Sequence, residues 1–237
     1  MPRSARDYPW SIPLQDGRIG PHGLSPADSW SPSASPSWAG TRTPVLAVGS
    51  NAAPGVLADK LAGVLTEAIE GQVEIEVCAV SGVAVGHSAH VSPGGYVAAA
   101  PLVDAMASGV ERIDTLPTGE QTAYSLGWFT AEQLDVLDRT EPSYERVLLP
   151  TSVRVVPRWS GVPVDRVAIY RSRHGLLGEH GQALRLCTQR EVHRWLAQRL
   201  PFLSGRWSAT AYADPQLRDR VRCELARRGL VVPSGLS

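Results

Sequence analysis

Hydrophobic and polar positions follow a globular pattern from Pro44 onward. The apolar run 45–48 is typical of a buried strand, and the polar residues 49–51 interrupt it. Apolar residues then recur on one helical face over 54–68, and the proline at the start of this stretch favours the first turn of a helix. The pattern therefore predicts a strand, a tight polar loop and a helix in succession.

The middle of the chain has mainly the pattern of strands. Valine-rich segments alternate loosely with polar residues, and Gly82 or Gly86 breaks the first of them. Thr130 suits the N-cap of a short helix that turns Leu134 and Leu137 inward. The predicted strands cover 73–91 in one or two pieces, 96–100, 121–129, 144–156 and 164–170, and 109–117 is irregular or a short strand.

Helical patterns return after Gly175. Thr188 is a suitable cap for a helix over 191–200, and Asp214-Pro215 begins a last helix that ends at Gly229. Because several strands follow one another directly, the predicted fold class is α+β: a mixed or antiparallel, barrel-like sheet with flanking helices. We expect residues 44–237 to form one domain.

Residues 1–43 differ from the rest of the chain. They are rich in Pro and Ser and have no periodic apolar pattern, so they are predicted to form an extended N-terminal segment. The segment nevertheless carries Trp10, Trp30 and Trp38, and such large apolar groups are poor choices for a free tail. We expect at least part of it to dock on the domain through these rings. Binding of a partner chain is the alternative.

Composition narrows the class of protein. The chain has 237 residues, 43% of them apolar and 19% charged, which is a globular balance, and Lys+Arg and Asp+Glu are equal at 23 each. A dedicated nucleic-acid binder is usually strongly basic, so neither nucleic acid nor a membrane is an expected partner. Cys78, Cys187 and Cys223 have no metal-site spacing. No apolar run is long enough to span a bilayer and no signal-peptide pattern begins the chain, so a cytoplasmic location is expected.

Charge is unevenly distributed, because residues 151–237 are net basic and residues 1–150 are net acidic. The last predicted helix has arginines on its outer face and Leu217, Val221 and Leu225 on its apolar stripe. A solvated basic face, or two parts of complementary charge packed together, explains this pattern. An anionic ligand or partner is the alternative.

Residues 48–51 are the first candidate for chemistry. Gly49 lets the backbone turn tightly and lets a ligand approach closely, and N–H groups at the start of the next helix point back at the same place. Such a loop binds a carboxylate or a phosphate, or it simply turns the chain. The phosphate-binding GxxxxGK[ST], dinucleotide-binding GxGxxG and nucleophile GxSxG patterns are absent here.

Glu141 is the second candidate. It follows the helix that contains Leu134 and Leu137, and a carboxylate at a helix C-terminus lies against the negative end of the helix dipole. Local stability therefore does not explain its place. It is either an ordinary surface glutamate or an acid/base group.

These segments together resemble the γ-glutamylcyclotransferase-like family. The matching segments are Val48-Gly49-Ser50-Asn51, Gly94-Gly95-Tyr96-Val97-Ala98, and Leu137-Asp138-Arg139-Thr140-Glu141 followed by Tyr144. Their order and spacing fit the family over about residues 44–171. The chain departs from the family pattern at Val48, where a tyrosine is usual, and in the short stretch between Glu141 and Tyr144.

The resemblance implies a cyclising enzyme without a metal or an organic cofactor. The substrate is a small molecule with a γ-glutamyl or related carboxylate group, and the products are 5-oxoproline and a free amine. The loop from Val48 through Gly49 and Ser50 to Asn51 binds the glutamyl part, with Gly95 and Tyr144 as further substrate-binding residues. Glu141 is the acid/base.

Two functional hypotheses stand at this point. The first is that the chain cleaves a γ-glutamyl amide or amine with Glu141 as general base and acid. The second is a non-catalytic metabolite-binding or scaffold protein on the same fold. Tyr144 has two readings as well, since its hydroxyl either contacts substrate or its ring packs in the core.

Overall fold

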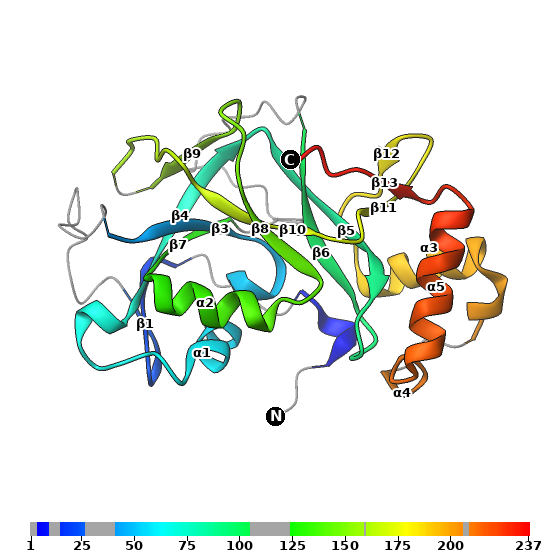
Figure 1. The fold of residues 1–237 in the computed structure, drawn as a ribbon, viewed down its shortest axis with the longest axis horizontal. Helices are drawn as coiled ribbons and strands as arrows, with labels where there is room; N and C mark the ends of the chain where they lie inside the picture. The colour runs from blue at the N-terminus through cyan, green and yellow to red at the C-terminus, as the bar shows by residue number, and fades with distance from the viewer. Residues whose placement is uncertain (1–3, 10–14, 27–40, 105–123, 159, 206–208) are drawn as a thin grey trace.

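The computed structural model describes residues 4–9, 15–26, 41–104, 124–158, 160–205 and 209–237. These residues form an α+β protein with two mixed or antiparallel sheets and helices packed beside them (Figure 1). This confirms the predicted class. The single barrel-like sheet is wrong for the described residues, because their strands form two sheets and no closed barrel.

The first sheet is mixed. Its β3 and β10 are parallel, and its other described strand pairs are antiparallel. In spatial order the strands are β2 (Gly23–Pro26), β1 (Gly17–Gly20), β4 (Val73–Ser81), β7 (Ser125–Phe129), β3 (Thr43–Ala47), β10 (Ala168–Ser172) and β8 (Tyr144–Leu148), with β9 (Arg154–Pro157) paired to β4.

The second sheet is antiparallel in its described pairs. Its strands in spatial order are β12 (Gln182–Ala183), β11 (Leu176–Glu179), β5 (Val83–Val91) and β6 (Val97–Val103), with β13 (Val231–Val232) paired to β11. Strand β4 belongs to the first sheet and β5 to the second, and only Gly82 separates them. Gly82 has φ +87°, which glycine adopts most readily, so the predicted break between two strands is confirmed there.

The helices cover the two sheets separately. Their bounds are α1 (Pro54–Leu61), α2 (Ala131–Thr140), α3 (Gln189–Arg199), α4 (Ala209–Tyr212) and α5 (Pro215–Arg227), with 3₁₀ turns η1 (Ala5–Asp7), η3 (Gly49–Ala52), η4 (Ile69–Gly71) and η6 (Pro201–Leu203). Leu57 of α1 and Leu137 of α2 belong to the core of the first sheet. Leu196 of α3 and Leu225 of α5 belong to another core cluster, which also contains Leu177 of β11. Figure 1 shows α3 and α5 on the side of the molecule where the second sheet lies.

Helix starts match the prediction because local caps determine them. Thr130 and Thr188 each accept a backbone N–H in a complete capping box, and Asp214 caps α5. The first helix was predicted to continue to Ala68, but it ends at Leu61. A turn that contains Gly63 follows directly after Leu61. The single strand predicted over 144–156 is two strands, β8 and β9, because a turn begins at Pro150.

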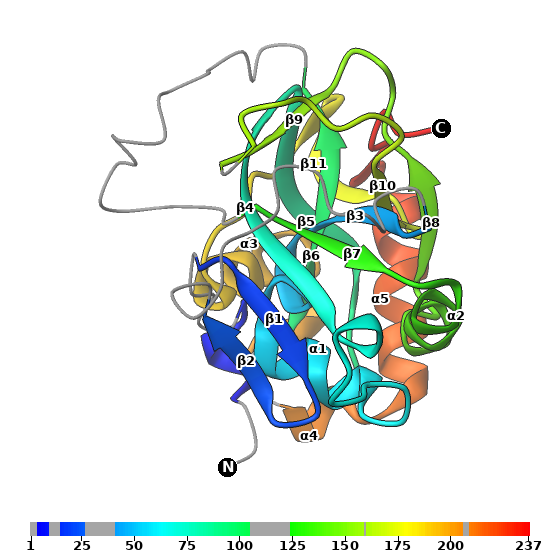
Figure 2. The same cartoon turned by 90° about the vertical axis from the view of Figure 1, so that its left-hand side faces the viewer.

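Residues 17–20 and 23–26 lie in the segment predicted to be extended, and they are strands of the first sheet. Strands β1 and β2 form a hairpin, and β1 pairs with β4 so that the hairpin extends the first sheet (Figure 2). Four-residue strands that contain glycine give no alternation to detect. Trp10, Trp30 and Trp38 lie outside the described residues, as do 109–117 and 121–123, so their docking and the strand predictions there stay predictions.

The arginines of α5 are largely engaged on the protein itself. Arg222 pairs with Asp219, while Arg227 and Arg228 both pair with Glu224. Arg220 stacks over the ring of Phe202, with 4.1 Å between its guanidinium carbon and the ring centroid. Because these arginines already have partners within the protein, they favour the solvated face over a dedicated anion site. Exposed pairs of this kind contribute little energy to stability. Among the described helices, none is long and apolar enough to cross a membrane.

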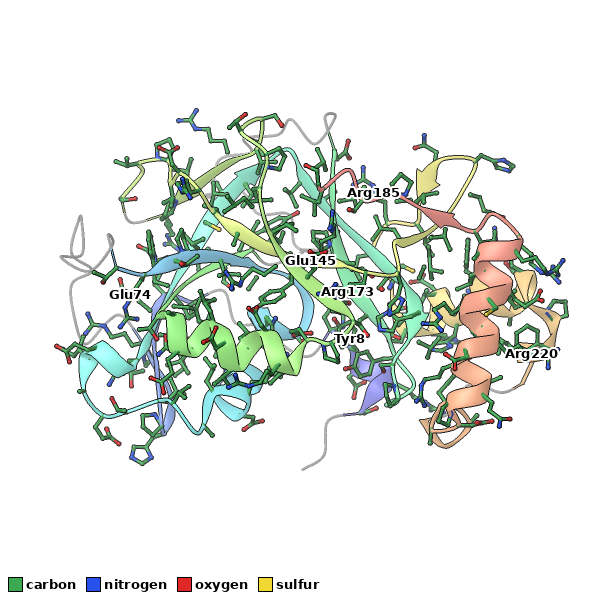
Figure 3. The ribbon with its side chains drawn as sticks, viewed as in Figure 1. Tyr8, Glu74, Glu145, Arg173, Arg185 and Arg220 are labelled. Carbon is green, nitrogen blue, oxygen red and sulfur yellow. The ribbon has the colours of Figure 1, made fainter. Side chains whose placement is uncertain are left out.

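Glu74 is a buried carboxyl of the first sheet. Glu74 on β4 is 3% exposed, and its Oε2 lies 3.5 Å from the Arg18 Nε of β1. Burial raises the pKa of Glu74 to about 7, and the Arg18 charge opposes that shift. Figure 3 shows Glu74 on the side of the molecule where β1 lies, away from Tyr8.

Glu74 makes stability depend on pH. Its folded-state pKa exceeds the ordinary value of 4.5, so the folded protein binds this proton more tightly than the unfolded chain. The protonated carboxyl stabilises the fold at low pH, and this contribution is lost as the pH rises from about 4.5 to about 7. We expect the Tm of Glu74→Gln minus that of the natural protein to rise across this window and then stay level. The exposed Glu132→Gln is the control, and a difference that does not change with pH contradicts the prediction.

Candidate active site

A cavity of about 210 Å³ lies where the two sheets approach each other. Its wall comes from the end of β3 with η3, from the β5–β6 hairpin, from the C-terminal end of α2 and from the residue after η1. Five predicted site residues line it together: Val48, Ser50, Asn51, Glu141 and Tyr144. The structure therefore brings together residues from distant parts of the sequence.

Gly49 forms the turn at the end of β3. Its φ of +63° is in the left-handed region, and a Cβ there would overlap the Tyr8 phenol oxygen and lie 3.0 Å from the Cβ of Ala99. Glycine is thus required both by conformation and by space. The turn carries the chain directly from the buried strand into η3, with Asn51 beside the cavity.

Glu141 occupies the C-cap of α2. The residue before a proline is disfavoured in the α region, so Pro142 ends the helix here, and Glu141 has φ −118° and ψ 54°. Its backbone N–H donates to the Asp138 carbonyl. The helix end places the Glu141 carboxylate in the cavity wall, where its side chain is only 12% exposed.

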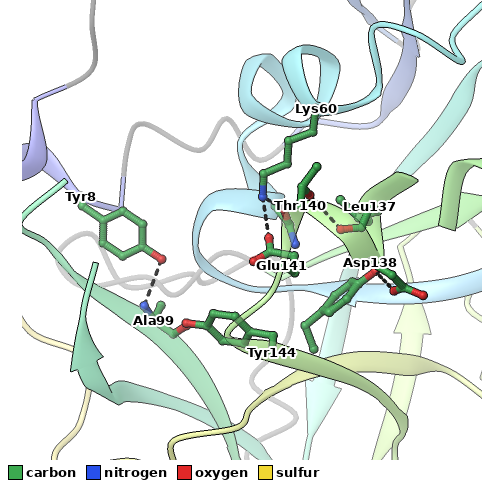
Figure 4. A network of polar contacts seen from close by, with 10 residues as sticks. Tyr8, Lys60, Ala99, Leu137, Asp138, Thr140, Glu141 and Tyr144 are labelled. Carbon is green, nitrogen blue, oxygen red and sulfur yellow. Dashed lines mark hydrogen bonds and ion pairs between the residues drawn. The ribbon is translucent and has the colours of Figure 1, made fainter. Parts of the chain in front are cut away.

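Lys60 joins the two predicted parts of the site. It is the only lysine in the chain and lies in the last turn of α1. Its Nζ donates to Glu141 Oε1 at 2.5 Å and to Asn51 Oδ1 at 2.7 Å (Figure 4). The ammonium therefore fixes the Glu141 carboxylate relative to the loop that follows β3.

Two tyrosines converge on one residue of β6. The Ala99 N–H donates to Tyr8 Oη at 3.0 Å, and the Tyr144 hydroxyl donates to the Ala99 carbonyl at 3.0 Å (Figure 4). Burial raises the pKa of both phenols well above the ordinary value, so both stay protonated near neutral pH. Tyr144 packs against an apolar cluster of the core and also lines the cavity, and its predicted contact with substrate stays a prediction.

The two histidines of β5, His87 and His90, make different contacts. His87 accepts the Cys187 N–H at its Nε2, 3.0 Å away. His90 lines the cavity, and its Nδ1 lies 2.6 Å from the hydroxyl oxygen of Ser88. Burial, with a smaller effect from His174, lowers the pKa of His90 to about 3, so this ring is neutral near pH 7.

Gly95 lies beside the cavity and does not line it. It is in the turn between β5 and β6 with φ +81°, and its carbonyl is 3.0 Å from His193 Nε2. The next residue, Tyr96, does line the cavity. The predicted substrate-binding role of Gly95 stays a prediction, and the structure shows its role in the turn.

Sequence reasoning did not place Lys60, Tyr8, Tyr96 or His90 in this site. A signal existed for Lys60, because a single lysine among 23 basic residues stands out. Tyr8 gave none, since it precedes the globular pattern by more than thirty positions. Within the described part of the chain, no three His, Cys, Asp or Glu side chains are grouped as metal ligands.

Comparisons with protein-family models, curated proteins and solved structures find no match to this chain.

The Lys60–Glu141 pair predicts a measurable coupling. Both side chains are largely shielded, at 18% and 12% exposed, so removing one leaves the other charge without its partner. A double-mutant cycle of Lys60→Met and Glu141→Gln by urea unfolding is expected to give about 1–3 kcal/mol. The exposed pair Arg222–Asp219 is the control and is expected to give less than about 0.5 kcal/mol. Equal values for the two pairs contradict the prediction.

Gly49→Ala is expected to destabilise the protein by about 2 kcal/mol or more. The substitution adds a left-handed alanine and a methyl group in contact with Tyr8 and Ala99. Gly63→Ala is the matched control, because a Cβ there meets nothing within 4 Å, and its effect is expected to stay within about 0.5 kcal/mol. Urea unfolding measures both, and similar small effects contradict the argument.

Proposed function

We propose that this chain is a cyclotransferase-type enzyme that releases 5-oxoproline from a γ-glutamyl amide or amine. The observation that carries the proposal is the position of Glu141: its shielded carboxylate lines the same small cavity as the loop of Val48, Ser50 and Asn51. The resemblance in sequence assigns the base and the binding loop to these segments. Their convergence supports that assignment independently of the motif spacing.

The cavity suits a compact acyl group. Its volume of about 210 Å³ and its mixture of tyrosines, apolar side chains and polar atoms fit a ligand of roughly glutamyl size. Hydrogen-bond donors of the loop after Gly49 are proposed to face the carbonyl oxygen where negative charge develops. The Lys60 ammonium adds a positive charge beside the carboxylate that acts as base.

The proposed reaction is an intramolecular acyl transfer. The α-nitrogen of the substrate attacks its own γ-carbonyl carbon, a carbon–nitrogen bond forms in a five-membered ring, and the original amide bond breaks. Glu141 takes protons from the α-nitrogen and passes them to the leaving nitrogen, which departs as an amine. The carboxylate is regenerated, and holding the chain folded supplies much of the rate.

The hydrogen bond from Lys60 to Glu141 leaves one carboxylate oxygen for the proposed proton transfer. Lys60 occupies Oε1, and in the described part of the chain no residue donates a hydrogen bond to Oε2. We assign proton transfer to Oε2, with Lys60 as the group that orients the carboxylate. The hydrogen bond from Tyr144 to Ala99 keeps the opposite wall in place.

The test is release of 5-oxoproline, followed by mass spectrometry. The substrates are γ-glutamyl amino acids, γ-glutamyl amines and glutathione. Glu141→Gln is expected to lower release by about 10²–10⁴-fold, because it removes the base and keeps the shape. Glu132→Gln, on the exposed first turn of the same helix, is the matched control and is expected to keep full activity.

Two results would contradict the proposal. One is full activity in Glu141→Gln, which removes the assigned base. The other is absence of 5-oxoproline from every substrate with the natural chain, which favours the non-catalytic binding protein instead.

A further inference from the structure

Tyr8 lines the cavity although it precedes the globular part of the sequence, which begins at Pro44. It follows η1, where Ser4 accepts the Arg6 N–H and so caps the turn. Although it lies in the segment predicted to be extended, Tyr8 is only 4% exposed. Its ring stacks on Tyr96 with 4.5 Å between centroids and 14° between planes. Figure 3 shows it in the interior near the C-terminal end of α2.

The phenol oxygen of Tyr8 lies against the predicted binding loop. It accepts the Ala99 N–H, and the backbone N–H of Ser50 also favours negative charge at this oxygen. The space beside it exists because residue 49 has no Cβ. Loop and phenol therefore have complementary shapes, and the hydroxyl supports the turn from which Ser50 and Asn51 face the cavity.

The ring of Tyr8 also limits the cavity. Tyr8, Tyr96, Ala98 and Ala99 form one stretch of the lining, and Val48 packs in the same apolar cluster. The residues at 98 and 99 are alanines, so the bulk on this side comes from Tyr8 together with Tyr96, on which its ring stacks. A ligand that extends further in this direction meets an aromatic ring held by stacking and by a hydrogen bond.

We propose that Tyr8 is a size-selecting and positioning residue of the site. Its ring sets the length of the acyl group, admitting an amino-dicarboxylic group of glutamyl length and excluding one with a further methylene. Its hydroxyl positions the loop of Gly49 and Ser50 for that group. The inference rests on the proposed function only for the class of ligand.

The experiment separates the ring from the hydroxyl by direct binding. Affinities for L-glutamate and for L-2-aminoadipate, which is one methylene longer, are measured by calorimetry on the full chain. The natural protein is expected to prefer L-glutamate by about tenfold or more, the discrimination that one methylene gives in a closed pocket. Tyr8→Ala, and the less disruptive Tyr8→Leu, are expected to remove or reverse this preference.

Tyr8→Phe is expected to act differently. The ring remains, so the length preference stays, and the affinity for L-glutamate falls about fivefold to tenfold because the loop loses its acceptor. Amide exchange at Ala99 is expected to accelerate in the same variant, since its N–H no longer has the phenol oxygen. Tyr124→Phe is the matched control: this phenol packs in the same cluster, bonds the Val83 carbonyl, and does not line the cavity.

The outcomes distinguish the inference from the proposed function. A length preference that depends on Tyr8 without any release of 5-oxoproline overturns the cyclisation and supports the inference. Release of 5-oxoproline together with the same length preference in all variants overturns the inference alone. Absence of binding of both acids by the natural protein also overturns it, as does unchanged Ala99 exchange in Tyr8→Phe.

Discussion

The arrangement of the candidate site depends on one ammonium group. Lys60 holds the side chains of Asn51 and Glu141 at hydrogen-bonding distance, although 81 positions separate Lys60 from Glu141. Three elements are connected by this contact, namely α1, the turn after β3 and the end of α2. A charge-assisted bond in a partly shielded place is both stronger and more directional than one in water. The core beneath α1 and α2 positions Lys60 and Glu141. The Lys60 ammonium then sets the distance between the proposed base and the proposed binding loop.

Polar contacts also connect the two sheets across the cavity. Tyr144 of β8 donates to Ala99 of β6, and the hydroxyls of Ser88 in β5 and Ser172 in β10 lie 2.6 Å apart. Buried polar groups are costly unless paired, so these contacts specify how one sheet meets the other. Two apolar clusters contribute to the cavity wall, since Leu137 and Tyr170 belong to one of them and Ala99 to another.

Local signals made part of this structure predictable. Capping residues at 130, 188 and 214 define helix starts within a few positions, and Gly82 marks the change of sheet. The loop at 48–51 and Glu141 were identified because motif residues lie at a strand end and a helix end. Tyr8 was not, because its role depends on a contact with Ala99 across 91 positions, and no periodicity records such a contact. The hairpin of β1 and β2 was missed because its strands are too short to show alternation.

As the only lysine of the chain, Lys60 is a specific target for chemical modification at the candidate site. Arginine does not react with the acylating reagents that modify primary amines, so the chain has a single side-chain amine for them, and it is bonded to Glu141. The rate at which such a reagent modifies this nitrogen thus depends on how open the ion pair is and on what fills the space beside it. Because the chain has one lysine, modification of a lysine side chain reports on the candidate site.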